Sequence, residues 1–317
     1  MKVIEVKQDR REEFHSLHPS GLFTSQDWCD IYPDALIRFM IVDDQDKAIG
    51  GFVAYEGGKR GLKTLITPPF APHCGLFALD QKNNPVKKNS FRKDIIDAIA
   101  SFLKSSSYVY FKLDFSPDWV DMQPMLWQSI ETNVRYTYRL DLKQTVEVIT
   151  GNLDSSKRNK INKAEREGFS VTHEPDLEIA WKLISSNLKV NGIATHDQIM
   201  KGILAFTTRH QNCFFTFSEI AEKKLAVNIS ITDQEVCYNL LSAVDRTSAV
   251  TNAGTMSLYY SILHARDLGL RVFDFEGSGV PEIEEYFRSF GGSLVPYFSV
   301  CGGKKPWPWI LKLTGKI

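Results

Sequence analysis

Long apolar runs are missing from this sequence of 317 residues. None approaches the roughly 20 residues of a membrane-spanning helix, and residues 1–13 carry charges where a signal peptide would have an apolar core. Paired cysteines are missing too, since the five cysteines are odd in number, widely spread and never in a Cys-x-x-Cys pair. These absences predict a cytoplasmic protein in a reducing compartment, without a transmembrane segment.

An excess of charge of one sign is also missing, because 38 lysines and arginines balance 38 aspartates and glutamates. No overall field would therefore draw the chain to DNA or to an anionic membrane, and any anion site must be local. Familiar catalytic signatures are absent, including the P-loop, His-Glu-x-x-His, Gly-x-Ser-x-Gly and Gly-x-Gly-x-x-Gly. The seven histidines are scattered, so we expect neither a metal site nor a tightly bound cofactor. The chemistry that remains is that of positioned carboxylates, hydroxyls and backbone N–H groups.

Length and composition predict two globular domains. Apolar residues make up 43% of the chain and charged residues 24%, which is ordinary for a globular protein. We place the boundary near residues 142–150 and divide the chain into domains 1–143 and 144–317.

Both halves show the same order of predicted elements. The first half shows strand patterns at 2–6, 37–42, 48–55 and 62–66, a hairpin turn at Gly57-Gly58, a helix at 91–103 and a strand at 108–115. The second half shows strand patterns at 213–220, 225–231 and 236–243, a helix at 255–268 and a strand at 270–275. The last strand of each half contains Asp-Phe. We interpret the repeat as an ancient duplication of one mixed α/β domain.

A segment rich in carboxylates, 270–292, is the first candidate site. Strand alternation places Asp274 and Glu276 on one face at the carboxyl end of a strand, where open α/β sheets bind ligands. Gly277-Ser278-Gly279 then lets the backbone turn into a helix begun by Pro281. Either carboxylate could act as general base for an attacking amine. The alternative is structural, with Asp274 paired to a neighbouring arginine and Ser278 capping the helix.

A basic helix is the second candidate site; it begins near Asp154 or Ser155 and ends at Gly168. Lys157 and Arg158 lie in its first turns, where the helix dipole disfavours cations. Such a helix start suits a phosphate or carboxylate ligand. The alternative is a solvated basic face.

The loop 245–254 is the third candidate, because free backbone N–H groups at the following helix start can hold a pyrophosphate or the end of a tRNA. Asn252 and Gly254 would allow close approach there. Any loop between a strand and a helix shares this pattern, so a structural loop is the alternative.

The last residues, 304–317, mix aromatic side chains with lysines, which predicts either a packed tail or a peripheral membrane contact.

The order and spacing of these motifs resemble the FemAB-like transferases, whose chains contain two tandem domains of the GNAT acyltransferase fold. The segments that carry the resemblance span most of the chain: 23–28, 136–142, 157–168, 252–265, 274–278 and 287–292. The resemblance implies transfer of an acyl or aminoacyl group from acyl-coenzyme A or aminoacyl-tRNA to an amine, often on a peptidoglycan precursor. Its acceptor groove would be shared by both domains.

Two features depart from the family pattern. No heptad stretch forms the coiled-coil arm of the peptidoglycan-bridge members. The Arg/Gln-x-x-Gly-x-Gly/Ala loop that usually holds coenzyme A pyrophosphate is also missing. The donor, coenzyme A thioester or tRNA ester, therefore stays open.

We thus expect an acyl or aminoacyl transferase that acts on an amine of a cell-envelope precursor or a related small molecule. Asp274 and Glu276 would handle the amine proton. The resemblance implies further site residues, which for the acceptor are Tyr138, Arg139, Arg158, Lys163 and Ser278 and for the donor Asn252, Gly254 and Thr255. Two alternatives remain: a catalytically inactive GNAT-fold protein that binds a glycan or peptide precursor, and an RNA-binding module that recognises a tRNA end.

Overall fold

A computed structural model describes residues 1–18, 21–32, 35–59, 61–80, 84–211, 213–248, 252–277, 279–304 and 306. The chain divides into two compact units, one of Met1–Arg135 with Pro296–Ile317 and one of Tyr136–Val295. This division differs from the predicted one at 143 and 144, because the strands β7 (Glu131–Asp141) and β13 (Ser293–Gly302) each contribute residues to both units. That 144–317 forms a domain by itself stays a prediction.

The first unit is built on a mixed sheet with strand order β1-β2-β3-β4-β6-β13, and β5 pairs with β3. Its further strands are β1 (Lys2–Glu5), β2 (Leu36–Val42), β3 (Ala48–Lys59), β4 (Leu62–Ile66), β5 (Phe77–Ala78) and β6 (Tyr110–Asp114). Its helices are η1 (Gln8–Arg10), α1 (Arg11–Leu17), η2 (Leu22–Thr24), α2 (Gln26–Cys29), α3 (Pro85–Ser105) and α4 (Gln123–Trp127). Only β4 and β6 pair in parallel among the described strands of this sheet.

The helix α3 covers the core of the first unit. Its buried face includes Ile95, Ile99 and Leu103, which belong to the same apolar cluster as Phe39 and Phe111 of the sheet. The helix is longer than predicted because the Asn84 side chain caps its start, with Pro85 in the first turn.

The predicted hairpin turn at Gly57-Gly58 is wrong by a few residues. Both glycines lie within β3 and pair with Thr64 and Lys63 of β4, so the chain reverses after Lys59. Gly58 has a φ of +129°, and a Cβ there would lie 2.0 Å from the Leu62 carbonyl oxygen. The glycine signal therefore reflects a close backbone approach inside the hairpin rather than its turn.

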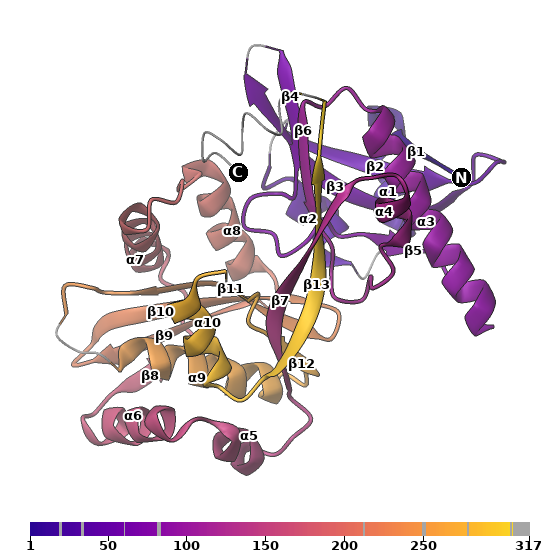
Figure 1. Ribbon diagram of the computed structural model, residues 1–317. Helices are drawn as coiled ribbons and strands as arrows, with labels where there is room; N and C mark the ends of the chain where they lie inside the picture. Colours follow the sequence, from indigo (N-terminus) through magenta and orange to yellow (C-terminus); the bar gives the residue numbers. More distant parts are fainter. Residues whose placement is uncertain are drawn as a thin grey trace. The chain divides into compact units, whose positions relative to one another are not determined.

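The second unit repeats this topology with strand order β7-β12-β11-β10-β9-β8. Its further strands are β8 (Ser170–Thr172), β9 (Phe214–Ile220), β10 (Lys223–Asp233), β11 (Val236–Val244) and β12 (Val272–Asp274). Its helices are α5 (Val146–Asn152), α6 (Ser155–Arg166), α7 (Leu177–Val190), α8 (Asp197–Arg209), α9 (Ala253–Asp267) and α10 (Pro281–Arg288). Figure 1 shows α7 and α8 on one side of β9–β11 and α9 on the other.

The two units share one plan, which confirms the predicted repeat of elements. In each, an antiparallel meander leads to a helix and then to a strand parallel to the meander's last strand: β4 with β6, and β11 with β12. In each, the next neighbour is antiparallel and comes from a distant part of the chain: β13 beside β6, and β7 beside β12.

Within the described parts of the chain, no helix is long and apolar enough to cross a membrane, and no cluster of side chains could hold a metal ion. All five cysteines are buried, and none of them forms a disulfide. Of the segment 304–317, for which a membrane contact was one expectation, only Lys304 and Pro306 lie among the described residues.

Candidate functional site

The carboxyl end of β12 is the point where the second sheet can receive a ligand. β12 pairs in parallel with β11 as far as Tyr238 opposite Asp274, while β11 itself runs on to Val244. The register of β11 against β10 shifts between Ile229 and Ser230, which makes Leu240 the extra residue of a bulge. Bulges commonly lie next to active sites, and open α/β sheets bind ligands beyond the carboxyl ends of their strands.

Asp274 ends β12 as a buried carboxylate with several partners. The Thr137 hydroxyl donates to its Oδ1 at 2.6 Å, and Arg139 Nε donates to its Oδ2 at 2.7 Å. The backbone N–H of Glu276 donates to Oδ1 at 2.8 Å. Arg139, a predicted acceptor-binding residue, is thus the ion-pair partner of Asp274, as expected if Asp274 has a structural role. These contacts fix Asp274 in one position, and a direct catalytic role for it stays a prediction.

Glu276 lies beside Asp274 in a different environment. Its φ of +61° is left-handed, which is uncommon for a residue with a side chain and is associated with functional sites. Its Oε1 is buried and has no hydrogen-bond partner within the described part of the chain. Burial, and then the charge of Asp274, raise the pKa of Glu276 well above its usual value.

The two carboxyl groups lie together as predicted, but a turn rather than strand alternation brings them there. β12 ends at Asp274, and Gly277 follows Glu276 with a φ of +67°. A Cβ on Gly277 would lie 2.0 Å from the Tyr136 carbonyl oxygen, so only glycine fits. Ser278, a predicted acceptor residue, lies outside the described residues, and the N-cap of α10 is Val280.

Tyr138, predicted to line the acceptor groove, is buried. Its hydroxyl donates to Oε1 of Glu284 on α10, and Arg288 Nε donates to the same oxygen at 3.1 Å. Burial and the bond to Glu284 raise the pKa of Tyr138. Its backbone oxygen accepts from Phe275 N at 3.0 Å, so Tyr138 ties β7 to both the end of β12 and α10.

The basic helix α6 begins and ends as predicted, with Asp154 as its cap. Arg158 turns back to α5, where its Nη1 donates to the carbonyl oxygens of Gly151, at 2.9 Å, and of Leu153. Lys163 is exposed and lies 3.6 Å from Glu167. Arg158 therefore has a structural partner, and its predicted role in anion binding, like that of Lys163, stays a prediction.

Lys157 is the buried cation of this helix. Its ammonium lies 4.0 Å from the centre of the Tyr286 ring and 5.6 Å from that of Phe290. Burial, and then the charge of Lys160, lower the pKa of Lys157 to about 8. The burial of Lys157 could have been predicted from helical spacing, because Lys157 lies on the same face of α6 as Ile161 and Ala164, the other buried residues of this helix.

Tyr286 connects Lys157 to the start of α9, the predicted donor site. Its phenol lies beside Thr255, and its oxygen lies 3.8 Å from where a Cβ on Gly254 would be. Asn252, the N-cap residue, is buried and makes no side-chain capping bond, and no acidic residue lies in the first turn. A helix start with free N–H groups and a nearby cation can hold a phosphate.

A polar network behind α9 was not foreseen from the sequence. Ser257 on α9 donates to Asn228 on β10, which donates to Asn239 on β11 at 2.7 Å. All three side chains are buried, and the network joins the helix start to the bulge in β11. In the sequence, the network could have been recognised from asparagines that interrupt otherwise apolar strands.

Comparison with known proteins supports a GNAT fold. Residues 155–288 match the family model of the acetyltransferase (GNAT) domain. No curated protein matches the chain in sequence. The crystal structure of FemX is similar at a TM-score of 0.66 and 11% identity, covering 99% of each chain.

Two further solved structures are similar at nearly the same level. The C-terminal domain of a putative lysylphosphatidylglycerol synthetase from Agrobacterium fabrum has a TM-score of 0.59 and 12% identity, over 96% of each chain. The L-PGS structure from Bacillus licheniformis has a TM-score of 0.58 and 10% identity, over 98% of this chain and 97% of the other. Identities this low show the fold alone. The predicted resemblance is confirmed at that level: the chain has a GNAT fold like that of FemX, and its residues 155–288 match the acetyltransferase (GNAT) family model.

Proposed function

We propose that this protein transfers an activated acyl or aminoacyl group to an amine at the carboxyl end of β12. The acetyltransferase domain match over 155–288 supports the reaction class. The observation that carries the proposal is Glu276, a carboxyl group with a buried oxygen that lacks a partner among the described residues and has a raised pKa. Such a group, held at the end of a strand, is suited to exchange a proton with an amine.

The reaction needs little more than positioning, because a thioester or aminoacyl ester is already activated. The amine nitrogen attacks the acyl carbon, so that a C–N bond forms as the C–S or C–O bond breaks. Glu276 takes the proton that the amine loses and returns it to the leaving sulfur or oxygen. Asp274 positions Glu276 through its backbone N–H. The N–H of Leu240, freed by the bulge, is our candidate donor to the oxyanion.

The donor's phosphate groups would lie at the start of α9. Asn252, Gly254 and Thr255 supply the uncapped first turn, and Lys157 supplies a cation beside Tyr286. An acyl-coenzyme A and an aminoacyl-tRNA both carry phosphates that such a helix start can bind. The residues therefore fit either donor.

We further propose that the acceptor is an amine of a cell-envelope precursor or a related small molecule. The similarity to FemX and to the domain of a putative lysylphosphatidylglycerol synthetase motivates this class. The acceptor contacts that we retain as proposals are Tyr138, Arg139, Arg158, Lys163 and Ser278.

The test is an assay of the purified protein with acyl-coenzyme A compounds and aminoacyl-tRNA as donors and envelope-precursor amines as acceptors. Products would be identified by mass spectrometry. We expect Glu276→Gln to lower turnover by about 10²-fold or more, with the melting temperature not lowered. The matched control is Glu282→Gln, since Glu282 is an exposed carboxylate on α10. Full turnover in Glu276→Gln would remove this carboxylate from the mechanism, and donor binding without any transfer by the unaltered chain would favour an inactive binding protein.

A further inference from the structure

The first unit contains a pocket that the proposed reaction does not use. It has a volume of about 820 Å³ and lies between the end of α3, the start of β6, the turn after α4 and the end of β13. The strand β6 corresponds to β12 of the second unit, because each pairs in parallel with the last strand of its meander. The counterpart of the site at Asp274 would therefore lie at Asp114, the carboxyl end of β6, whereas the pocket adjoins Tyr108 and Phe111 at the start of β6. The pocket is therefore not the counterpart of that site. Volumes of this size are typical of small-ligand sites.

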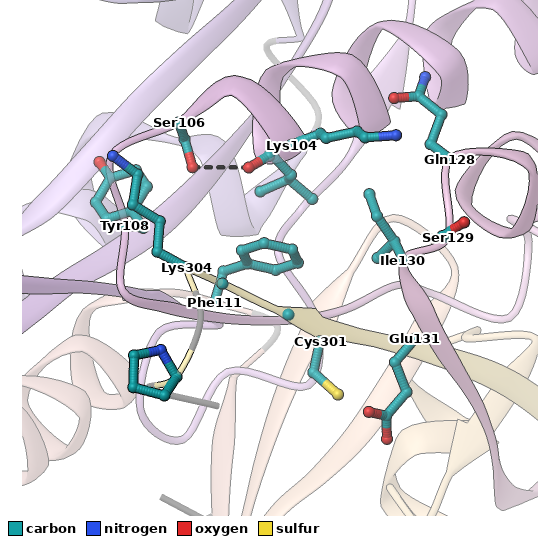
Figure 2. Close-up of a pocket in the computed structure, with 14 residues that line it drawn as sticks. Lys104, Ser106, Tyr108, Phe111, Gln128, Ser129, Ile130, Glu131, Cys301 and Lys304 are labelled. Carbon is teal, nitrogen blue, oxygen red and sulfur yellow. Dashed lines mark hydrogen bonds between the residues drawn. The ribbon is translucent and has the colours of Figure 1, made fainter. Parts of the chain in front are cut away.

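The walls of the pocket are apolar and belong to the core. Leu103, Phe111 and Ile130 are buried members of the main apolar cluster of this unit. Figure 2 shows the side chains of Phe111 and Ile130 on either side of the space, while the Cys301 side chain points away from it. Because these walls are held by core packing, the pocket can receive an apolar group without rearranging the fold.

Two lysines stand at the rim of the pocket. Lys104 and Lys304 are exposed, and neither makes an ion pair with any residue that the structure describes. Figure 2 shows the Lys104 side chain extending toward Gln128 and the Lys304 side chain toward Tyr108, so the two ammonium groups stand on opposite sides of the rim. The one acidic residue among the lining residues, Glu131, accepts from Asn133 at 3.3 Å. The two lysines therefore favour an anionic group at the rim.

We propose that this pocket binds a soluble amphiphile with one acyl chain and one anionic head, namely a fatty carboxylate. The acyl chain would lie between Phe111 and Ile130, and the carboxylate would lie at the rim, in the positive field of Lys104 and Lys304. A recess of about 820 Å³ can enclose a whole acyl chain. A lipid in a bilayer would have to leave the membrane to place its acyl chain there, whereas a soluble fatty carboxylate would not.

The residues that follow Pro306 are the competing occupant, because Pro306 itself lines the pocket. They include apolar side chains, but their charged side chains are lysines only, at Lys312 and Lys316. That charge has the same sign as the two lysines at the rim, so charge complementarity favours an anionic amphiphile over this segment.

The test is calorimetric titration of the full chain with dodecanoate and, separately, with dodecanol, both below the concentrations at which they aggregate. We expect saturable binding of dodecanoate at one site. The double variant Lys104→Gln/Lys304→Gln should weaken dodecanoate binding about threefold to tenfold, the scale of two exposed ion pairs, and leave dodecanol binding unchanged. The matched control is Lys87→Gln/Lys88→Gln, two exposed lysines at the other end of α3. The double variant Lys104→Arg/Lys304→Arg should retain dodecanoate binding.

A photoreactive fatty carboxylate locates the site, and we expect it to label peptides that contain residues 103–111, 128–131 or 301–304. Four results would overturn the proposal: no saturable binding to the full chain, equal weakening in the control, labelling confined to other peptides, or binding only to vesicles of anionic phospholipid. Binding that arises only in a chain ending at Pro306 would also overturn it, since the occupant would then be the segment beyond that residue.

Discussion

Glu276 links the proposed chemistry to the pH dependence of folding. Its pKa in the folded protein is raised above the ordinary value of 4.5, so at higher pH the folded state binds more protons than the unfolded state. The contribution of Glu276 to stability is therefore fully present below about pH 4.5 and is lost as the pH rises through the folded-state pKa.

We expect Glu276→Gln to remove this loss, because the amide does not ionise. The free energy of unfolding of the variant, relative to the unaltered protein, should be higher at pH 8 than at pH 4. Denaturant unfolding at both pH values measures the difference. The same slope in both proteins would mean that Glu276 is solvated or paired in solution, and its assignment as proton acceptor would lose its basis.

Lys157 gives a second prediction at the scale of one side chain. We expect Lys157→Met to weaken binding of acyl-coenzyme A or aminoacyl-tRNA, because the only buried cation beside the start of α9 among the described residues is lost. Since the pKa of Lys157 is about 8, donor affinity of the unaltered protein should also fall as the pH rises through that value. Both effects are measured by titration calorimetry between pH 6.5 and 9.

The matched control for that prediction is Lys160→Met, which removes an exposed lysine from the same helix. Its effect on donor binding should be small and should decrease with added salt. Equal losses in the two variants would show that the helix contributes only a diffuse positive field.

The link between α5 and α6 shows how one arginine side chain can hold two helices together. Arg158 donates to carbonyl oxygens of Gly151 and Leu153 at the end of α5, which satisfies groups that a helix end leaves free. We expect Arg158→Ala to lower the free energy of unfolding by about 1.5–3 kcal/mol, the scale of a hydrogen bond to a charged group. Lys160→Ala, at an exposed position of the same helix, should leave stability nearly unchanged. Unchanged stability in Arg158→Ala together with weaker ligand binding would restore the predicted binding role.

Local patterns predicted the meander strands and the helix and strand that follow them in each half, but they missed α7 and α8 and the partners of several strands. The caps and glycine ends of helices such as α6 depend on neighbouring residues, so their bounds follow from the sequence. The burial of Lys157 and the shift of the turn beyond Gly57-Gly58 depend on packing and on pairing between strands. The left-handed turn at Glu276 is invisible in strand alternation, because a polar residue after a strand fits either conformation.

Strand partners are the largest part of the fold that the sequence did not show. β7 follows β6 along the chain but pairs with β12, at Asp274 opposite Arg139. β13 follows β12 and α10 but pairs with β6, at Ser299 opposite Asp114. Neither strand pairs with its sequence neighbour in these ladders, so a domain boundary drawn along the sequence separates each of them from the sheet it completes.

Two fragments of the second half test which boundary describes the folding unit. The fragment 136–295 retains the end of β7, with Thr137 and Arg139 bound to Asp274. The fragment 144–317 keeps Asp274 but loses all three contacts of β7 with β12. Removing one partner of a buried ion pair costs about 3–5 kcal/mol, which is a large part of the roughly 5–15 kcal/mol that stabilises a domain.

We therefore expect fragment 136–295 to unfold cooperatively on heating and fragment 144–317 to lack a cooperative transition at the same temperature and concentration. Circular dichroism and differential scanning calorimetry on both fragments measure this. Asp274→Asn in fragment 136–295 separates the two causes, because it breaks the ion pair while keeping the strand. If that variant unfolds cooperatively at only a slightly lower temperature, the strand pairing is the larger contribution. Cooperative unfolding of 144–317 at an equal temperature would show that β7 is dispensable, and the domain boundary predicted from the sequence would hold.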